Sequence, residues 1–267
     1  MQKVVLITGA SSGIGKSIGE FLTEKGFKVY GTSRNPENYS DCKFELLSLD
    51  VRKPETIKLV IEQIIQKSNR LDVVINNAGV GITGPLEEIP MAEIKNNFET
   101  NFFGPIEVMK AVLPQMRSQK SGLIINITSI AGYMGLPFRG IYSASKGALE
   151  LISESLSMEV KPFGINICNV APGDFATNIA SGRFHSPIIS GSDYEQKYSQ
   201  NLKTMDNHVI SGGNPFEMAE AIYKIIQSPN PKIHYKVGAF MQKFSIVLKR
   251  ILPDKVYEKI LMNHYKL

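Results

Sequence analysis

Apolar and polar residues along this chain follow two repeating patterns that alternate from the first residues onward. Residues 4–7 form a continuous apolar run, which is typical of a strand buried on both faces of a sheet. Ile14, Ile18 and Leu22 then recur at helical spacing, and Gly26 stands where such a helix would end. The same two patterns predict strands over 4–7, 29–32, 44–49, 71–75, 123–127, 165–170 and 233–237, and helices from 14 towards 26, from 54 onward, over 91–117 with an interruption at Gly104-Pro105, over 142–161 and over 215–227.

Strands that alternate with helices imply a parallel sheet whose crossover helices cover both faces. We therefore predict an α/β fold with a single Rossmann-type, doubly wound parallel sheet of about seven strands. One domain is expected over residues 1–237, with a basic amphipathic helical extension of the same domain over 238–267. Residues 174–214 are rich in Ser, Gly and Asn and show poor periodicity, so they are expected to form a loop over a substrate, often a lid.

Composition excludes several classes of protein. Of the 267 residues, 43% are hydrophobic and 21% are charged, which excludes a largely disordered chain. Two cysteines cannot build a disulfide framework, and the histidines show no metal-ligand spacing, so no metal is expected. Cys168 is expected to be a buried thiol within a strand. No apolar run reaches about 18 residues, and the N-terminal one is too short for a signal peptide, so a cytoplasmic location is expected.

Positive charge is concentrated at the C-terminal end of the chain. Residues 232–267 carry eight Lys or Arg and two acidic residues, so this segment accounts for the basic balance of the whole chain, which is +5. A nucleic-acid-binding domain is therefore not expected. Within the tail, Met241, Phe244, Val247, Leu248 and Ile251 recur at helical spacing. We favour a helix packed over the substrate entrance or at a subunit contact, and a peripheral membrane-surface helix stays open as the alternative.

A glycine-rich turn follows the first predicted strand and opens the first predicted helix. It reads Thr8-Gly9-Ala10-Ser11-Ser12-Gly13-Ile14-Gly15. Glycines permit a tight turn and let backbone N–H groups approach a pyrophosphate, and the helix N-terminus adds a favourable dipole. On the first strand of a parallel sheet, this turn predicts nucleotide binding rather than an ordinary strand-to-helix connection.

With its Thr-Gly-x3-Gly-x-Gly spacing, the chain resembles the short-chain dehydrogenase/reductase family. Further family motifs follow in order, and each has a counterpart here. They are Asn76-Asn77-Ala78-Gly79, Asn101, Ser129, Tyr142-x3-Lys146, and Pro172-Gly173 with Thr177, where Phe175 stands in the usual position of a valine. The resemblance is strong over about residues 1–180, moderate to 237 and poor in the tail. It implies a dinucleotide-binding oxidoreductase domain.

The end of the second strand decides which nicotinamide cofactor is expected. Ser33 stands where members that prefer NAD typically carry Asp, and Arg34 follows it. Arginine pairs a phosphate bidentately, so we predict a preference for NADP(H) over NAD(H). Asp50 and Val51 resemble the pair that contacts adenine, with Asp50 as the acceptor. The cofactor-binding residues implied by the resemblance are Gly9, Ser11, Ser12, Gly13, Ile14, Gly15, Ser33, Arg34, Asp50, Val51, Asn77, Ala78, Gly79, Tyr142, Lys146, Pro172, Gly173, Phe175 and Thr177.

Reduction of a carbonyl group needs a proton at the developing alkoxide. Tyr142 and Lys146 are one helical turn apart, so the positive charge of the lysine can favour the tyrosinate. The resemblance implies that Tyr142 is the general acid/base and that Lys146 assists it and holds the ribose. It further implies that Ser129 orients the substrate oxygen and that Asn101 supports a water path to Lys146.

The expected substrate is an apolar carbonyl compound or its alcohol. The residues expected to line its pocket are largely apolar, namely Tyr133, Met134, Leu136, Phe138, Phe175, Ile179 and Phe184. Family members are usually homodimers or homotetramers built through helices equivalent to 91–117 and 142–161. Three alternatives stay open: a 3-oxoacyl-thioester reductase whose basic tail meets an acidic carrier, a non-catalytic dinucleotide-sensing binding protein, and a membrane-surface scaffold.

Overall fold

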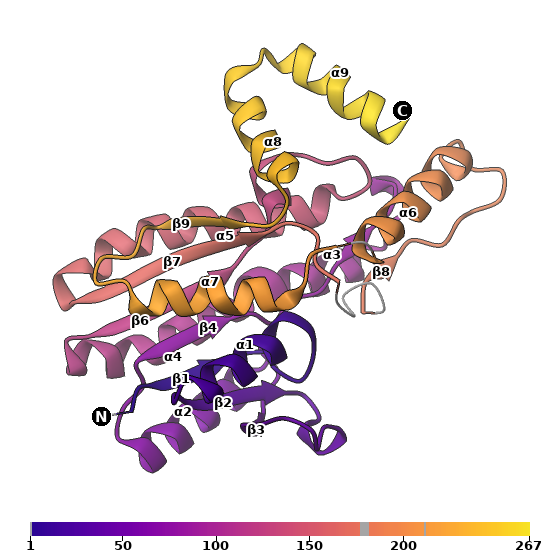
Figure 1. Ribbon diagram of the computed structural model, residues 1–267. Helices are drawn as coiled ribbons and strands as arrows, with labels where there is room; N and C mark the ends of the chain where they lie inside the picture. The colour runs from indigo at the N-terminus through magenta and orange to yellow at the C-terminus, as the bar shows by residue number, and fades with distance from the viewer. Residues whose placement is uncertain (1, 177–181, 211) are drawn as a thin grey trace.

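The computed structural model describes residues 2–176, 182–210 and 212–267 (Figure 1). Its elements in chain order are β1 (Val4–Ile7), α1 (Gly13–Glu24), β2 (Lys28–Ser33), η1 (Pro36–Asn38), β3 (Glu45–Ser48), α2 (Pro54–Ser68), β4 (Val73–Asn76), β5 (Ile82–Thr83), η2 (Leu86–Glu88), α3 (Met91–Phe98), η3 (Glu99–Phe103), α4 (Gly104–Gln119), β6 (Gly122–Ile127), η4 (Ile130–Tyr133), α5 (Gly140–Val160), η5 (Lys161–Phe163), β7 (Ile165–Pro172), β8 (Phe184–His185), α6 (Glu195–Ile210), α7 (Pro215–Gln227), β9 (His234–Val237), α8 (Phe240–Ile251) and α9 (Asp254–Tyr265).

Seven strands form one parallel sheet in the order β3-β2-β1-β4-β6-β7-β9, which confirms the predicted fold class. The strand order reverses between β1 and β4, because β2 and β3 extend the sheet on one side and β6, β7 and β9 on the other. In sheets of this kind, ligands bind beyond the carboxyl ends of the strands at this reversal. The glycine-rich turn after β1 lies at that place.

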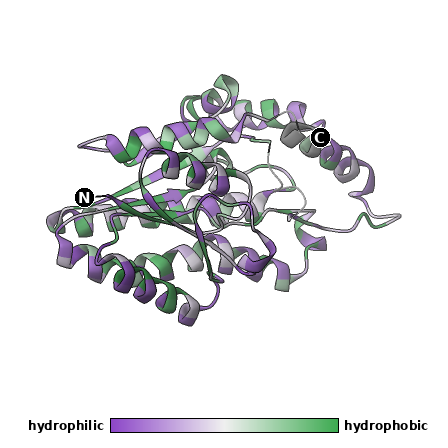
Figure 2. Cartoon of the chain, turned by 60° about the horizontal axis from the view of Figure 1, so that its bottom comes forward, coloured by the Kyte–Doolittle hydropathy of each residue, from purple (hydrophilic) through white to green (hydrophobic). Residues whose placement is uncertain are grey.

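Successive residues of each strand pack into two separate hydrophobic cores, one on each face of the sheet. Leu6 and Val74 belong to the core under α2, α4 and α5, whereas Ile7 and Ile75 belong to the core under α1 and α7. Figure 1 shows α1 and α7 in front of the sheet, and Figure 2 shows mostly hydrophobic strands between helices that carry both colours. Because both faces are covered, continuous apolar runs rather than alternating ones marked these strands in the sequence.

Two expectations about the helices were wrong. The interruption at Gly104-Pro105 does not exist, because α3 passes into α4 through a π-helical turn, Glu99–Phe103, and the proline occupies the first turn of α4. Segment 174–214 is not simply a loop, because it contains β8, which pairs with β5, and the helix α6. Polar residues dominate α6, and among its described side chains, those of 195–205, the buried apolar ones are Tyr198 and Met205, so its periodicity was weak.

The predicted C-terminal extension consists of α8 and α9, which we call the C-terminal arm (238–267). Ile246 of α8 and Tyr257 of α9 pack on Ile130 and Met134 at η4. The end of the arm returns to α6, where Asn201 Nδ2 donates to the Tyr265 carbonyl oxygen at 2.9 Å. Across the described residues, no helix has the length and apolar character needed to span a membrane.

Candidate active site

Thr8 joins the glycine-rich turn to the segment that follows β4. Its Oγ1 accepts hydrogen bonds from the backbone N–H groups of Asn77 at 3.0 Å and Ala78 at 3.1 Å. In the opposite direction, the Asn77 side chain donates hydrogen bonds to the carbonyl oxygens of Thr8 and Gly9. Two motifs almost 70 residues apart in the chain are thereby locked together where the strand order reverses.

The turn has the geometry that close approach of a phosphate requires. Gly9 and Gly13 have positive φ angles of 64° and 55°, which other residues rarely adopt. A Cβ atom on Gly15 would lie only 2.4 Å from the Gly9 carbonyl oxygen. Ser12 precedes α1, but its side chain makes no capping hydrogen bond to the first N–H groups of the helix. Ser11 and Ile14 belong to the same turn. The backbone N–H groups of this turn and of the start of α1 suit a pyrophosphate.

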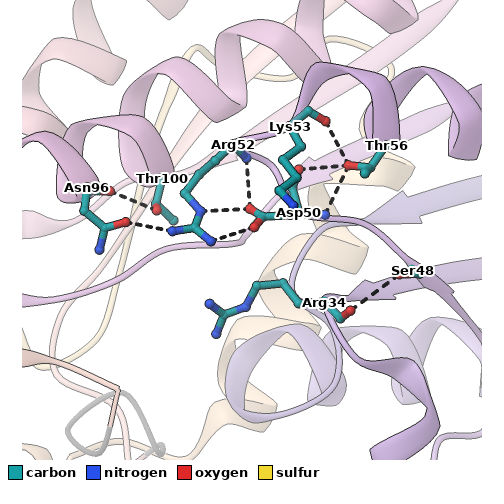
Figure 3. A network of polar contacts seen from close by, with 8 residues as sticks. All are labelled: Arg34, Ser48, Asp50, Arg52, Lys53, Thr56, Asn96 and Thr100. Carbon is teal, nitrogen blue, oxygen red and sulfur yellow. Dashed lines mark hydrogen bonds and ion pairs between the residues drawn. The ribbon is translucent and has the colours of Figure 1, made fainter.

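Arg34 and Asp50 lie near each other at the ends of β2 and β3 (Figure 3). Arg52, which the sequence analysis missed, binds the Asp50 carboxylate through Nε at 3.0 Å and Nη2 at 2.6 Å, and its Nη1 reaches Asn96. The hydrogen-bonded Arg52 guanidinium holds the pKa of Asp50 below its usual range, with a smaller contribution from Arg34. Within the described residues, the Arg34 guanidinium has no ion pair of its own, so it is available to an anion.

The carboxylate of Asp50, predicted to accept a hydrogen bond from adenine, already accepts hydrogen bonds from Arg52. Oxygen lone pairs remain for a further donor, because each carboxylate oxygen accepts more than one hydrogen bond. Val51 is buried, and a Cβ atom on Gly104 would lie 2.9 Å from the Val51 Cβ. Ser33 is partly exposed beside Arg34 at the end of β2.

Ser129 and Tyr142 line one pocket together with Ile14 from the glycine-rich turn and Gly173 and Phe175 after β7. Ser129 follows β6 and caps η4, with its Oγ accepting the Ala131 N–H at 3.1 Å. This capping role uses an oxygen lone pair and leaves the hydroxyl proton able to reach a ligand. Tyr142 lies in the first turn of α5 and is almost fully buried.

Lys146 lies one turn further along α5 and is buried, with its Nζ donating to the Ile127 carbonyl oxygen at 2.9 Å. Burial lowers the pKa of Lys146 from 10.5 to about 8, and the Glu150 carboxylate opposes that shift. A Cβ atom on Gly79 would lie 3.4 Å from Lys146 Nζ and 3.2 Å from Asn101 Oδ1. The structure thus gathers these three predicted residues around one point.

Asn101 lies in the π-helical turn between α3 and α4. Its Oδ1 accepts the Val80 N–H at 2.8 Å, and its Nδ2 donates to the Val80 carbonyl oxygen at 2.9 Å and to Ser145 Oγ at 3.3 Å. The π turn changes the register of the helix by one residue, and such turns are frequent at functional sites. The wider turn presents the Asn101 side chain to the segment after β4.

A buried polar network beyond Lys146 was not foreseen from the sequence. Glu150 accepts hydrogen bonds from Thr128 and, at 3.0 Å, from the Tyr133 hydroxyl, and its Oε2 lies 2.9 Å from His234 Nδ1. His234 Nε2 in turn lies 3.0 Å from a carboxylate oxygen of Glu154. His234 is therefore occupied by carboxylates, and no cluster of metal-binding side chains occurs among the residues that the structure describes.

The segment after β7 is held by a residue of the C-terminal arm. Gln242 Nε2 donates to Asp174 Oδ2 at 2.7 Å, and its Oε1 accepts the Asp174 N–H at 3.3 Å. Gln242 also lies so close to Gly173 that a Cβ atom there would meet its Oε1 at 2.0 Å. Pro172 ends β7 directly before this contact. The predicted cofactor residue Thr177 lies outside the described residues.

The pocket is more polar than the sequence analysis predicted. Arg139, Asp174 and Arg183 line it beside the residues named above. Tyr133 instead faces Glu150 and His234, and Met134 packs under the C-terminal arm. Leu136 joins the clusters around both Met134 and Tyr142, Phe138 packs against Tyr198, Phe184 lies in β8, and Ile179 is outside the described residues.

The buried thiol was predicted correctly. Cys168 is fully buried in β7, and burial raises the pKa of its thiol to about 12. A thiol with so high a pKa is a poor nucleophile at neutral pH, since the thiolate is the reactive form.

The structure combines a parallel doubly wound sheet, an open glycine-rich turn and a tyrosine and lysine one helical turn apart. This combination is typical of a nucleotide-dependent oxidoreductase, and comparison with known proteins agrees. The family described as short chain dehydrogenase matches residues 3–187. The chain belongs to this family of oxidoreductases, which act on carbonyl and alcohol groups.

Individual relatives extend the similarity over the whole chain. The 3-ketodihydrosphingosine reductase of Bacteroides thetaiotaomicron is 43% identical over 265 residues, which cover 98% of each chain. The crystal structure of a short-chain dehydrogenase from Streptomyces avermitilis is 32% identical with a TM-score of 0.81, covering 99% of this chain and 97% of that one. A structure described as ElxO with NADP bound is 28% identical with a TM-score of 0.71, covering 89% and 97%.

Proposed function

We propose that this protein is an NADP(H)-dependent reductase that converts the ketone of a long-chain, largely apolar compound to the alcohol. The observation that carries the proposal is the joint placement of Ser129 and Tyr142 in one pocket, with Lys146 buried one turn behind Tyr142. The resemblance to the family assigns these residues to proton transfer, and the pocket opens between the glycine-rich turn and the segment after β7.

The dinucleotide, when bound, supplies the hydride. Gly9 to Gly15 and the N-terminus of α1 would hold its pyrophosphate, and Lys146 would hold the ribose next to the nicotinamide. Ser129 donates a hydrogen bond to the substrate carbonyl oxygen, and Tyr142 transfers its proton to that oxygen as negative charge develops there. The Lys146 ammonium stabilises the resulting tyrosinate. Asn101, which is hydrogen-bonded to Val80, would support the return of a proton to Lys146 through water.

The substrate proposal combines the pocket with one relative. Phe175 and Ile82 offer apolar surface, whereas Arg139, Asp174 and Arg183 offer charged groups. A compound with a long apolar chain and a polar end beside the ketone fits this mixture. We therefore propose 3-ketodihydrosphingosine, the substrate in the name of the Bacteroides relative, as the first compound to test.

The test follows oxidation of NADPH and NADH at the nicotinamide absorbance, with 3-ketodihydrosphingosine, apolar ketones and 3-oxoacyl thioesters in parallel. Turnover of the long-chain ketone with NADPH supports the proposal. Faster turnover of 3-oxoacyl thioesters would favour the thioester reductase instead. Cofactor binding with no turnover of any compound would favour a dinucleotide-sensing protein.

The cofactor preference is expected to depend on Arg34. Arg34→Ser should lower kcat/KM for NADPH by roughly 10-fold to 100-fold, because a charged hydrogen-bonding partner contributes about 1.5–3 kcal/mol. The value for NADH should change less than about 3-fold, since NADH has no 2′-phosphate to lose. Initial-rate kinetics with both cofactors measure the two effects, and Lys58→Ser, at an exposed lysine of α2, is the matched control. An equal loss with both cofactors would contradict the assignment.

We also propose that the chain forms a homodimer or homotetramer through the face of α4 and α5. Leu151 and Met158 are seven residues apart on α5, share one face of the helix and are both exposed. Met158→Lys should shift the mass in light scattering towards the monomer, because an unpaired charge would have to be buried in the contact. An unchanged oligomer would place the contact elsewhere.

A further inference from the structure

Helix α8 turns an apolar stripe away from the protein. Ile246 is only 1% exposed, and Gln242 on the same side bonds to Asp174. Phe240, Val247 and Ile251 are 72%, 43% and 67% exposed. At about 100° per residue these three positions lie within a narrow sector, whose centre is turned by about 120° or more from Ile246 and Gln242. The sequence analysis favoured an amphipathic helix packed through the side that carries Met241, Phe244, Val247, Leu248 and Ile251. Leu248 does pack at η4 beside Ile246, but Met241, Val247 and Ile251 are exposed.

The outward stripe consists of the exposed Phe240, Val247 and Ile251 and the partly buried Phe244 between them. The rings of Phe240 and Phe244 are stacked, with their centroids 5.7 Å apart and an interplanar angle of 11°. Scattered exposed apolar residues are normal, but a contiguous stripe on one helix marks an interaction site.

Basic residues are concentrated in the same C-terminal arm as the outward stripe. Residues 238–267 carry six Lys or Arg against two acidic residues, and the six are Lys243, Lys249, Arg250, Lys255, Lys259 and Lys266. Lys243 and Arg250 project from α8 at one border of the stripe, by helical position. Lys255 and Lys259 lie on α9, both exposed, four residues apart. A second copy of the chain would bring the same positive charge to the contact, so charge complementarity selects an anionic partner.

An apolar stripe bordered by lysine and arginine is the chemistry of a helix that lies in the surface of an anionic membrane. The aromatic and aliphatic side chains enter the boundary between headgroups and acyl chains, and the basic side chains stay at the phosphates. An acidic soluble protein would satisfy the charge, but it would leave the stacked phenylalanine rings without an apolar counterpart.

We propose that the C-terminal arm docks this protein peripherally on an anionic lipid surface, through the outward stripe and the exposed basic residues of α8 and α9. The arm also reaches the pocket: burial raises the pKa of Tyr265, and a hydrogen bond with Arg139 opposes that shift. Arg139 and Asp174, the partner of Gln242, both line the pocket. Docking through the arm therefore brings the pocket close to the lipid surface. The docking proposal itself needs no catalytic activity and is tested without it.

The test is flotation of the full-length protein with vesicles of phosphatidylcholine that contain increasing phosphatidylglycerol. Wild type is expected to float with anionic vesicles at low salt, to stay below with phosphatidylcholine alone, and to release at high salt. The stripe variant Phe240→Ser/Val247→Ser/Ile251→Ser and the charge variant Lys243→Glu/Lys255→Glu/Lys259→Glu should each lower the partition coefficient tenfold or more.

A matched control carries three exposed apolar substitutions away from the arm, Leu59→Ser/Leu86→Ser/Met91→Ser, and should float like wild type. Thermal unfolding of every variant verifies folding, and all the substituted apolar side chains are exposed. Equal flotation of the stripe variant and wild type would overturn the proposal. Failure of the wild type to float with anionic vesicles would overturn it as well. A stripe variant that lowers only the mass in light scattering would assign the surface to a second copy. Binding of an acidic carrier protein without binding of vesicles would assign it to that partner.

Discussion

Tyr142→Phe is expected to reduce kcat by on the order of 10³-fold, since general acid–base groups contribute about 10²-fold to 10⁴-fold. The substitution removes a single hydroxyl group from a buried ring that lines the pocket with Ser129. Affinity for NADPH should change much less than kcat, because Tyr142 is one of many residues expected to hold the cofactor and the glycine-rich turn is untouched. Steady-state kinetics in the direction of reduction, with a fluorescence titration of NADPH, separate the two effects.

Tyr30→Phe is the matched control for this experiment. Tyr30 is also buried, but it lies in β2 with its hydroxyl 2.9 Å from Ser68 Oγ and does not line the pocket. It should keep kcat within about 2-fold and lose only the net free energy of one hydrogen bond, about 1 kcal/mol. If Tyr142→Phe kept more than a fifth of wild-type activity, another group would have to supply the proton.

Lys146→Met is expected to lower the rate of ketone reduction and to raise the free energy of unfolding at pH 7. Burial lowers the pKa of Lys146 to about 8 in the folded protein, against 10.5 for an exposed lysine. Below pH 8 the folded protein therefore carries a buried charge at a cost of about 3 kcal/mol, since each unit of pKa corresponds to about 1.4 kcal/mol. Methionine has a similar length and no charge to bury, so the variant should unfold at a higher temperature at pH 7.

The stability difference should depend on pH in a defined direction. Between pH 8 and 10.5 the unfolded chain binds a proton at Lys146 that the folded protein has released, so the wild type gains stability as the pH rises. The advantage of the methionine variant should therefore shrink across this range and be smallest near pH 10.5. Denaturant unfolding at several pH values, without cofactor, measures the difference. A constant difference would show that Lys146 does not titrate there.

Activity should report the same titration. The rate of ketone reduction by the wild type should fall above about pH 8, because a neutral Lys146 no longer stabilises the tyrosinate that proton transfer leaves behind. Lys146→Met should be on the order of 10²-fold slower at pH 7 and should lack this alkaline limb. If the rates of both proteins fell over the same alkaline pH range, a group other than Lys146 would be responsible for the loss.

Much of the fold followed from the sequence because its strands are buried on both faces. A continuous apolar run such as 4–7 does not fit an amphipathic helix of the same length, and each of the seven strands was predicted to within two residues at its ends. The two-residue strands β5 and β8 and the helix α6 carry too few apolar positions to leave a pattern. Their pairing and packing depend on contacts between distant segments, as between Ile82 and Phe184.

The candidate site divides in the same way. The spacing of Tyr142 and Lys146, the glycines and Ser129 could be found in the sequence because local geometry and family motifs constrain them. Arg52 could have been noticed two residues after Asp50, but Gln242 and Tyr265 lie beyond the motifs and reach the pocket only through tertiary packing. The charged pocket lining was missed for the same reason, because Arg139 and Asp174 are far apart in the chain.

The sequence by itself determined the class of fold, the position of the glycine-rich turn and the spacing of the residues expected to transfer a proton. These features depend on local chemistry: apolar runs, glycine conformations and helical spacing. Only the tertiary structure decided which side of α8 faces the protein, because periodicity shows that a helix has an apolar side but not what that side meets. Ile246 and Gln242 fill the space at η4 and Gly173, so Phe240 and Ile251 are left facing outward.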